Sequence, residues 1–216
     1  MTQLIWVVRH GNREDFHNRD WSKTAARPYD PGLSPDGAEQ AREAGRGLIN
    51  KRVDRIYASP YLRTIQTASH IADVLSLSIR LEPGIGECLP NVQELPEILS
   101  EEDRLRQFSR IDPSHVPYYQ PVFPEPEDVA HHHAARTVRR LADQHPSENF
   151  VVVTHASPVV GIVRHLTNTQ DKIRVPCAPS SPWLAAATLG SPRQRRHLAP
   201  ERSGSRSALR SCGMTG

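Results

Sequence analysis

The side chains of this sequence that could do chemistry are two arginines, two histidines and one glutamate: Arg9, His10, Arg63, Glu87 and His155. Four of them carry or can carry positive charge, so they would repel one another unless an anion sat among them. A phosphoryl group suits that place, because arginine forks match its oxygens and cations stabilise its charge during transfer. These residue types predict a site for phosphoryl transfer, provided that the fold brings them together.

Each residue has a role in that chemistry. A neutral imidazole nitrogen of His10 can attack phosphorus as a nucleophile, which divides the transfer into two steps through a phosphohistidine. The departing alkoxide needs a proton, and a carboxylic acid with a raised pKa at Glu87 is the nearest candidate. Arg9, Arg63 and His155 would surround the phosphate. This scheme requires no metal and no cofactor.

The first of these residues follow an apolar run near the amino terminus. Residues 4–8 are apolar without helical spacing, which is typical of a buried strand in an α/β sheet. Arg9 and His10 come directly after it, and Gly11 would let a ligand approach the backbone. Ligands of open α/β sheets bind outside the carboxyl ends of the strands. The alternative is a strand that simply runs into a polar turn.

The other three residues follow further predicted strands. These are residues 54–59, with Arg63 in the first turn of the next helix, 78–81, with Glu87 on the following turn, and 150–154, with His155 directly after. Taken singly, an arginine at a helix start often pairs with a surface acid, and a histidine at a strand end is usually a satisfied polar residue. Convergence at one sheet edge favours a shared site.

Helical spacing between the strands completes an α/β pattern. Serine and proline together predict an N-cap and a first-turn proline at the start of two helices. Helices are expected after Ser34-Pro35 and after Ser59-Pro60, over residues 129–142, and from Ala156 to Leu166. The expected fold is a three-layer α/β/α sandwich with a mostly parallel central sheet and an inserted lid.

Two long connections and an unusual carboxyl end complete the domain plan. Residues 12–32 read as a loop, and residues 88–126 hold seven of the nineteen prolines. With helical spacing only over 98–108, the second connection is typical of a lid or substrate-binding insertion. Residues 1–175 are expected to form one domain. Residues 176–216, rich in Pro, Ser and Arg, are expected to be an atypical, disordered basic tail.

Composition limits the partners and the compartment. The formal net charge is +3, but residues 190–216 hold six arginines and a single acid, so the rest of the chain is slightly acidic. A nucleic-acid partner is therefore not expected. Three scattered cysteines favour reduced thiols. Because no apolar run is long enough for a membrane span or a signal peptide, we expect a soluble cytoplasmic protein.

Four motifs occur in order along the chain: Val8-Arg9-His10-Gly11, Leu33-Ser34-Pro35-x-Gly37-x-x-Gln40-Ala41, Ser59-Pro60-x-x-Arg63-x-x-Gln66-Thr67-Ala68 and Val153-Thr154-His155. Together they resemble the histidine phosphatase superfamily, also called the phosphoglycerate-mutase-like fold, over roughly residues 3–168. That resemblance implies that His10 is the phosphorylated nucleophile and that Arg9, Arg63 and His155 complete the phosphate pocket.

One branch of the superfamily resembles this chain more closely. Its Glu-Pro-Gly-x-x-Glu turn carries the proton donor where Glu87 stands, and its Arg-His-Gly-Glu-Arg-x-Asp motif is similar to residues 9–15. This branch includes the phosphatase domains of suppressor-of-T-cell-receptor-signalling proteins and ecdysteroid-phosphate phosphatase. Mutases of the superfamily carry Glu-Ser-x-x-Asn after Arg-His-Gly, whereas residues 12–15 are Asn-Arg-Glu-Asp. The resemblance therefore favours a phosphatase. Family members also return to the sheet with a further edge strand, where this chain enters its Pro/Ser/Arg-rich stretch.

The leading hypothesis is a metal-independent phosphomonoesterase acting through a phosphohistidine on His10. The alternatives are a catalytically weak phosphoryl-ligand binding module of the same fold and a phosphoglycerate-type mutase. The presence of both His10 and Glu87 favours turnover. Candidate substrates are phosphorylated small molecules and phosphotyrosine, and the sequence does not indicate an oligomeric state. Residues 131–133, all histidine, are not expected to bind a metal, because consecutive residues on a helix point in different directions.

Overall fold

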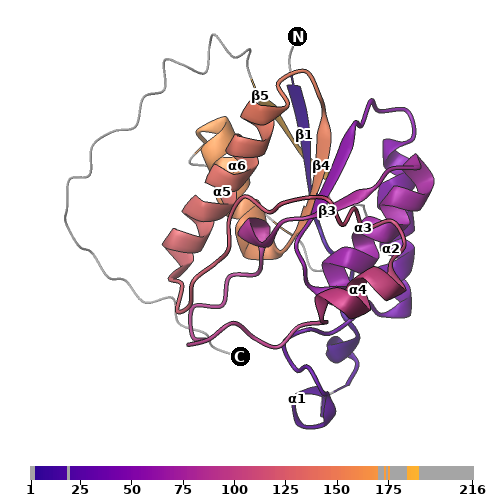
Figure 1. Cartoon of the computed structure of the whole chain (residues 1–216), viewed down its shortest axis with the longest axis vertical. Coiled ribbons are helices and arrows are strands. Elements are labelled where there is room, and N and C mark those ends of the chain that lie inside the picture. Colours follow the sequence, from indigo (N-terminus) through magenta and orange to yellow (C-terminus); the bar gives the residue numbers. More distant parts are fainter. Residues whose placement is uncertain (1–2, 19, 170–172, 174, 176–183, 190–216) are drawn as a thin grey trace, which may run out of the picture.

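The computed structural model describes residues 3–18, 20–169, 173, 175 and 184–189. Its central sheet has the strand order β3-β2-β4-β1-β5 (Figure 1). The first four strands in this order run parallel, and β5 pairs antiparallel with β1. The strands are β1 (Gln3–Arg9), β2 (Arg55–Ala58), β3 (Ile79–Leu81), β4 (Phe150–Thr154) and β5 (Leu184–Leu189). The predicted mostly parallel α/β sheet is confirmed.

The two central strands show why the apolar runs become strands. Every residue of β4 is buried, and Ile5 and Val7 of β1 are almost fully buried, as a sheet covered on both faces requires. Val153 of β4 is level with both Val8 of β1 and Ala58 of β2. This register brings the carboxyl ends of all three strands to one line, so the residues that follow them emerge side by side.

Two pairs of helices cover the sheet and make the predicted three layers (Figure 1). Val8 and Val153 share a core cluster with residues of α2 and α3, whereas Val7 and Val152 share another with residues of α5 and α6. Neighbouring strand residues point to opposite faces, so each face receives its own pair of helices. The helices are α2 (Pro35–Leu48), α3 (Leu62–Leu75), α5 (Glu127–Gln144) and α6 (Ala156–Thr167).

Helix starts agree with the sequence in one case and differ in another. Ser34 caps α2 as predicted, accepting a hydrogen bond from Gly37 N at 3.3 Å. The predicted cap at Ser59-Pro60 is wrong, because α3 begins at Leu62 and the Ser59 hydroxyl instead contacts His155. The connections hold only short helices: η1 (Glu14–Phe16) and α1 (Trp21–Thr24) within residues 12–32, η2 (Pro83–Ile85) after β3, and α4 (Glu101–Gln107) within 88–126.

The prediction of a disordered tail is wrong for residues 184–189. Leu184–Leu189, placed by the sequence in a disordered tail, form β5 and cover the outer edge of β1, with Ala187 level with Ile5. A short apolar run in a Pro/Ser-rich stretch gave little indication of a strand, because its pairing with β1 lies some 180 residues away in the chain. The remainder of that prediction, residues 176–183 and 190–216, lies outside the described residues.

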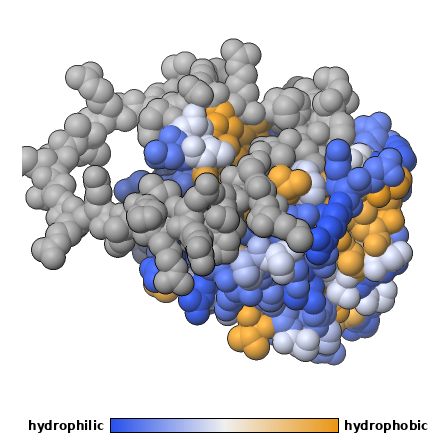
Figure 2. All heavy atoms as spheres, turned by 90° about the horizontal axis from the view of Figure 1, so that it is seen from above, coloured by the Kyte–Doolittle hydropathy of each residue, from blue (hydrophilic) through white to orange (hydrophobic). Residues whose placement is uncertain are grey.

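The surface is mixed in character. Seen from above, the described surface is largely hydrophilic, with hydrophobic residues in separate patches (Figure 2). Among the described helices, none has the length and apolar character to cross a membrane.

Candidate active site

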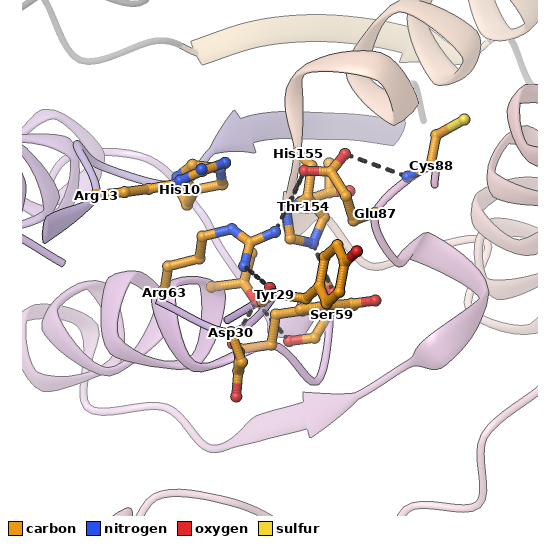
Figure 3. Close-up of polar contacts among 12 residues, drawn as sticks. His10, Arg13, Tyr29, Asp30, Ser59, Arg63, Glu87, Cys88, Thr154 and His155 are labelled. Atoms are coloured by element: carbon orange, nitrogen blue, oxygen red, sulfur yellow. Dashed lines mark hydrogen bonds and ion pairs between the residues drawn. The ribbon is translucent and has the colours of Figure 1, made fainter. Parts of the chain in front are cut away.

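Four of the residues singled out by the sequence meet at the carboxyl edge of the sheet (Figure 3): His10, Arg63, Glu87 and His155. The rings of His10 and His155 lie 5.3 Å apart between centroids, at an angle of 64°. Glu87 Oε2 lies 3.3 Å from Nη2 of Arg63 and 3.3 Å from Nδ1 of His155. Arg9 ends β1, close enough for its charge to contribute to a lower pKa of His10. The predicted convergence is therefore present.

The backbone around His10 is held tightly from two sides. His10 N donates to Thr154 O at 3.0 Å, and Gly11 N donates to the Thr67 hydroxyl at 3.2 Å. A Cβ on Gly11 would lie 2.3 Å from the carbonyl oxygen of Gly37. Gly11 was expected to give a ligand room, but the space beside it is filled by the first turn of α2. Its lack of a side chain lets this helix approach the backbone next to His10.

His10 is held as a neutral ring with a defined tautomer. Its Nδ1 lies 2.7 Å from the carbonyl oxygen of Gly11, and a carbonyl can only accept, so Nδ1 carries the proton. Burial, followed by the charges of His155 and Arg63, holds the pKa of His10 well below its usual value. Nε2 therefore carries a free lone pair at neutral pH. This is the state that a nucleophilic imidazole needs.

His155 stands between β4 and α6 and is completely buried. Its Nε2 lies 2.8 Å from the hydroxyl of Ser59, and its Nδ1 faces Glu87. Burial lowers the pKa of His155 to about 4, although the Glu87 carboxylate acts in the opposite direction. The ring is therefore neutral at pH 7. Ser59, which the sequence analysis treated only as a helix cap, is a partner of this ring.

Arg63 and Glu87 form the charged half of the cluster. Arg63 is 2% exposed, and its Nη1 donates to Tyr29 O at 3.2 Å while Nη2 faces Glu87. Burial alone would raise the pKa of Glu87, but His155, Arg63 and His10 outweigh it and hold this pKa well below its usual value. The prediction of a raised pKa is thus wrong for this arrangement, because the carboxylate faces the guanidinium of Arg63 and lies 3.3 Å from the ring nitrogen of His155.

Arg13 is a residue that sequence reasoning missed. It belongs to the polar cluster drawn in Figure 3, and its charge contributes to the pKa values of Arg63 and His155. Its Nε donates to Asp15 Oδ1 at 2.9 Å, and a second guanidinium nitrogen contacts the other carboxylate oxygen. This bidentate contact fixes the direction of the side chain. The available signal was its place three residues after His10, inside a motif already noted.

The charges decide which kind of ligand suits the cluster. One ligand atom from each of His10, Glu87 and His155 lies within 4.8 Å of the others, a spacing that a metal ion could use. However, Arg63 is in contact with Glu87, and the charges of Arg9 and Arg13 also act on the cluster. These three guanidinium groups outnumber the carboxylates of Glu87 and of Asp15, the partner of Arg13, so the cluster repels a cation and attracts an anion. The arrangement suits an oxyanion such as phosphate.

The triple histidine of α5 does not gather into a site. His131 Nε2 contacts the Ser157 hydroxyl at 2.7 Å, whereas His133 Nδ1 contacts Glu125 at 2.7 Å. The rings of His131 and His133 therefore have different partners.

A cavity of about 520 Å³ opens beside Glu87 and Tyr61. Most of its walls come from residues 88–126, the connection that the sequence identified as a substrate-binding insertion. Apolar and proline side chains predominate, including Pro96, Leu99, Pro117 and Phe123. Such cavities next to reactive groups commonly hold the part of a ligand that does not react.

The chain belongs to the histidine phosphatase superfamily (branch 1), whose model matches residues 5–176. Ubiquitin-associated and SH3 domain-containing protein A of Mus musculus is 50% identical over 116 residues, covering 38% of this chain and 19% of that protein. Ecdysteroid-phosphate phosphatase of Drosophila melanogaster is 26% identical over 205 residues, covering 76% of this chain and 27% of that protein. The chain thus spans only about a quarter or less of these relatives.

A solved structure shares the fold over almost its whole length. The ecdysone phosphate phosphatase of Bombix mori, in complex with tungstate, has a TM-score of 0.69 at 19% identity, covering 97% of this chain and 98% of that chain. At this identity the likeness establishes the fold. These comparisons agree with the resemblance noted in the sequence, both for the superfamily and for the group that includes ecdysteroid-phosphate phosphatase.

Proposed function

We propose that this chain is a phosphomonoesterase that works through a phosphohistidine on His10. The observation that carries the proposal is the state of His10, whose Nδ1 proton is held by Gly11 O while Nε2 keeps its lone pair. Beside this nucleophile, the guanidinium groups of Arg9, Arg13 and Arg63 supply charge for a phosphoryl group. Membership of the superfamily supports the proposal. So does the tungstate complex of the Bombix mori protein, because tungstate is a phosphate-shaped oxyanion.

The reaction balances in two steps. In the first, Nε2 of His10 attacks phosphorus, the P–O bond to the leaving group breaks, and protonated Glu87 gives its proton to the departing oxygen. In the second, Glu87 takes a proton from water, the resulting hydroxide attacks phosphorus, and the P–N bond breaks. His10 returns to its neutral state and phosphate leaves. His155 stays neutral in both steps and takes part only through hydrogen bonds.

Glu87 acquires its proton through substrate binding. In the arrangement described above it is a carboxylate, since the neighbouring His155 and the guanidinium of Arg63 hold its pKa down. A phosphate dianion bound to the arginines offsets their charge and adds negative charge beside Glu87, which raises the pKa of its carboxyl group. Glu87 then takes up a proton together with the substrate. The protonated Glu87 that the sequence predicted is therefore expected only when substrate is bound.

The cavity supplies the leaving-group site. Its lining holds the carboxylates of Glu97, Glu101 and Asp112 and the guanidinium of Arg104, and Asp112 is also paired with Arg80 at 3.3 Å. A leaving group with its own carboxylate or second phosphate would be repelled, whereas an uncharged, largely apolar alcohol or phenol would be accepted. Phosphorylated small molecules of that kind, or the aryl ring of phosphotyrosine, are the substrates that this lining favours. Phosphoglycerate, the substrate of the mutase alternative, carries the disfavoured charge.

The test compares the full chain with His10→Ala, using phenyl phosphate. Wild-type protein is expected to release phosphate and to trap acid-labile phosphate covalently, and His10→Ala is expected to do neither. His132→Ala, a change at an exposed histidine, serves as the control. Dialysis against EDTA should leave wild-type turnover unchanged, because the arginines provide the charge that a metal would otherwise supply. Normal turnover by His10→Ala would contradict the proposal, and transfer between positions of phosphoglycerate without release would indicate a mutase.

A further inference from the structure

Glu82 is a buried carboxylate beside the candidate active site that the proposed chemistry does not use. Its side chain is 0% exposed, and it stands at the start of the turn that ends in Glu87. A carboxylate removed from water must obtain hydrogen bonds that replace its hydration. The partners of Glu82 therefore reveal which parts of the chain it holds together.

Most of these partners belong to a distant segment. Glu82 Oε2 accepts from Tyr118 N at 2.8 Å and Oε1 accepts from Tyr119 N at 3.2 Å. Nε2 of His115 lies 3.6 Å from Oε2. The remaining bond, from Gly84 N at 3.2 Å, stays within the turn of Glu82 itself. The carboxylate thus fastens residues 115–119 to the turn that carries Glu87.

That segment is one wall of the cavity. Its side chains also make three contacts with the rest of the fold: His115 with the ring of Tyr57, Tyr119 with the ring of His133, and Tyr118 with the guanidinium of Arg140. His115, Pro117 and Gln120 line the cavity. The neighbouring apolar side chains point outward, with Val116 83% exposed and Val122 75% exposed. Burial of these two side chains therefore contributes little to the position of this wall. Its backbone is fixed by hydrogen bonds to a charged acceptor, which are stronger than those between neutral groups.

The turn that carries Glu87 has separate anchors. Glu82 N donates to Ala58 O at 2.8 Å, and the hydroxyl of Thr154 donates to Ile85 O at 2.6 Å. Neither bond uses the Glu82 carboxylate. Loss of the carboxylate should therefore release the wall while Glu87 keeps its place in the catalytic cluster.

We infer that Glu82 is a positioning residue for leaving-group selectivity, which fixes the wall formed by residues 115–121 against the turn that carries Glu87. The inference rests on the proposed function, because it takes the cavity as the leaving-group site. Glu82 contacts neither the nucleophile nor the phosphate pocket. Its effect should therefore depend on the size of the leaving group and be absent for an oxyanion alone.

The test uses Glu82→Gln in the full chain. Glutamine keeps the shape of the side chain but replaces one accepting oxygen with an amide nitrogen that cannot accept from a backbone N–H. The substrates are phenyl phosphate and 1-naphthyl phosphate, two aryl esters that differ in the size of the leaving group. We expect KM for the naphthyl ester to rise about tenfold. KM for the phenyl ester and inhibition by orthovanadate should not change. Glu102→Gln, at an exposed position of α4, is the matched control.

A second pair of variants reaches the same contact from the other side. Tyr118→Pro removes the N–H that Glu82 accepts, and Tyr118→Phe retains it. Tyr118→Pro should reproduce the loss of naphthyl selectivity, and Tyr118→Phe should not. This pair decides the question if Glu82→Gln does not fold.

Two results would overturn this inference and leave the proposed function standing. One is a naphthyl-to-phenyl ratio of kcat/KM that is unchanged in folded Glu82→Gln or in folded Tyr118→Pro. The other is a loss of orthovanadate inhibition in the same variant, which would indicate general damage to the site. Absence of hydrolysis by wild-type protein would instead overturn the proposed function, and this inference with it.

Discussion

Lowering the pH from 7 to 5 should destabilise the folded chain through His155, and replacing this residue with asparagine should remove that part of the effect. Burial lowers the pKa of His155 to about 4 in the folded chain, whereas an unfolded chain has the ordinary value of about 6.5. Between these values the unfolded chain binds a proton that the folded chain does not. The stabilising contribution of the neutral ring is therefore complete above pH 6.5 and is lost as the pH falls towards 4.

The size of the effect follows from the two pKa values. Proton linkage with pKa values of about 4 and 6.5 gives a loss of about 2 kcal/mol in the free energy of unfolding between pH 7 and pH 5. His155 is 0% exposed, so solvent does not screen this term. Glu87 contributes little in this range, because its carboxyl group is ionised in the folded chain and largely so in the unfolded chain. The buried ring of His10 acts in the same direction, but it is present in both proteins.

The assay is urea denaturation of wild type and His155→Asn at pH 7, 6 and 5, followed by tryptophan fluorescence. The substitution also removes contacts with Ser59 and Glu87 and so lowers stability at every pH. Only the pH dependence tests the argument. The wild-type free energy should fall by about 2 kcal/mol more than that of the variant. His17→Asn, at an exposed histidine, should keep the wild-type dependence. Equal slopes for wild type and His155→Asn would refute the reasoning.

Two further predictions follow from contacts at the site. Arg63→Lys should lower kcat/KM for phenyl phosphate about 100-fold. An ammonium group cannot contact Tyr29 O and Glu87 at once and also offer a fork to the phosphate of the proposed substrate. The exposed Arg42→Lys should have no effect, and an unchanged kcat/KM for Arg63→Lys would show that Arg63 does not bind the substrate. Gly11→Ala should lower the free energy of unfolding by about 2 kcal/mol, since its Cβ would lie 2.3 Å from the carbonyl oxygen of Gly37. Gly47→Ala, with nothing within 4 Å of the added Cβ, should raise the free energy of unfolding by about 1 kcal/mol. Urea denaturation that showed both variants stabilised, or both destabilised, would contradict this contrast.

Local patterns in the sequence predicted most of the fold. The apolar runs of β1 and β4 and the serine cap of α2 depend on neighbours within a few residues, so they were readable without the structure. The start of α3 was misjudged because the Ser59 hydroxyl has a partner 96 residues away, at His155. β5 was missed for the same kind of reason, since its pairing partner is at the other end of the chain.

The members of the site were more predictable than their electrostatics. Strand ends placed Arg9, His10 and His155 at one edge, because that follows from topology. The pKa of Glu87 depends on distances of a few ångströms to Arg63 and His155, which no sequence pattern contains. The side chain of Arg13 is likewise directed by its contact with Asp15, so its effect on Arg63 and His155 was visible only in three dimensions.

The place of β1 in the sheet has a consequence for the order in which the protein can assemble. β1 lies between β4 and β5, both of which come from the last third of the chain. During synthesis the first strand therefore leaves the ribosome long before either neighbour exists, and closing the sheet requires contacts of high sequence separation, which form slowly. His10 and His155 meet only when β4 has joined β1. A growing chain thus acquires its candidate active site in one late step.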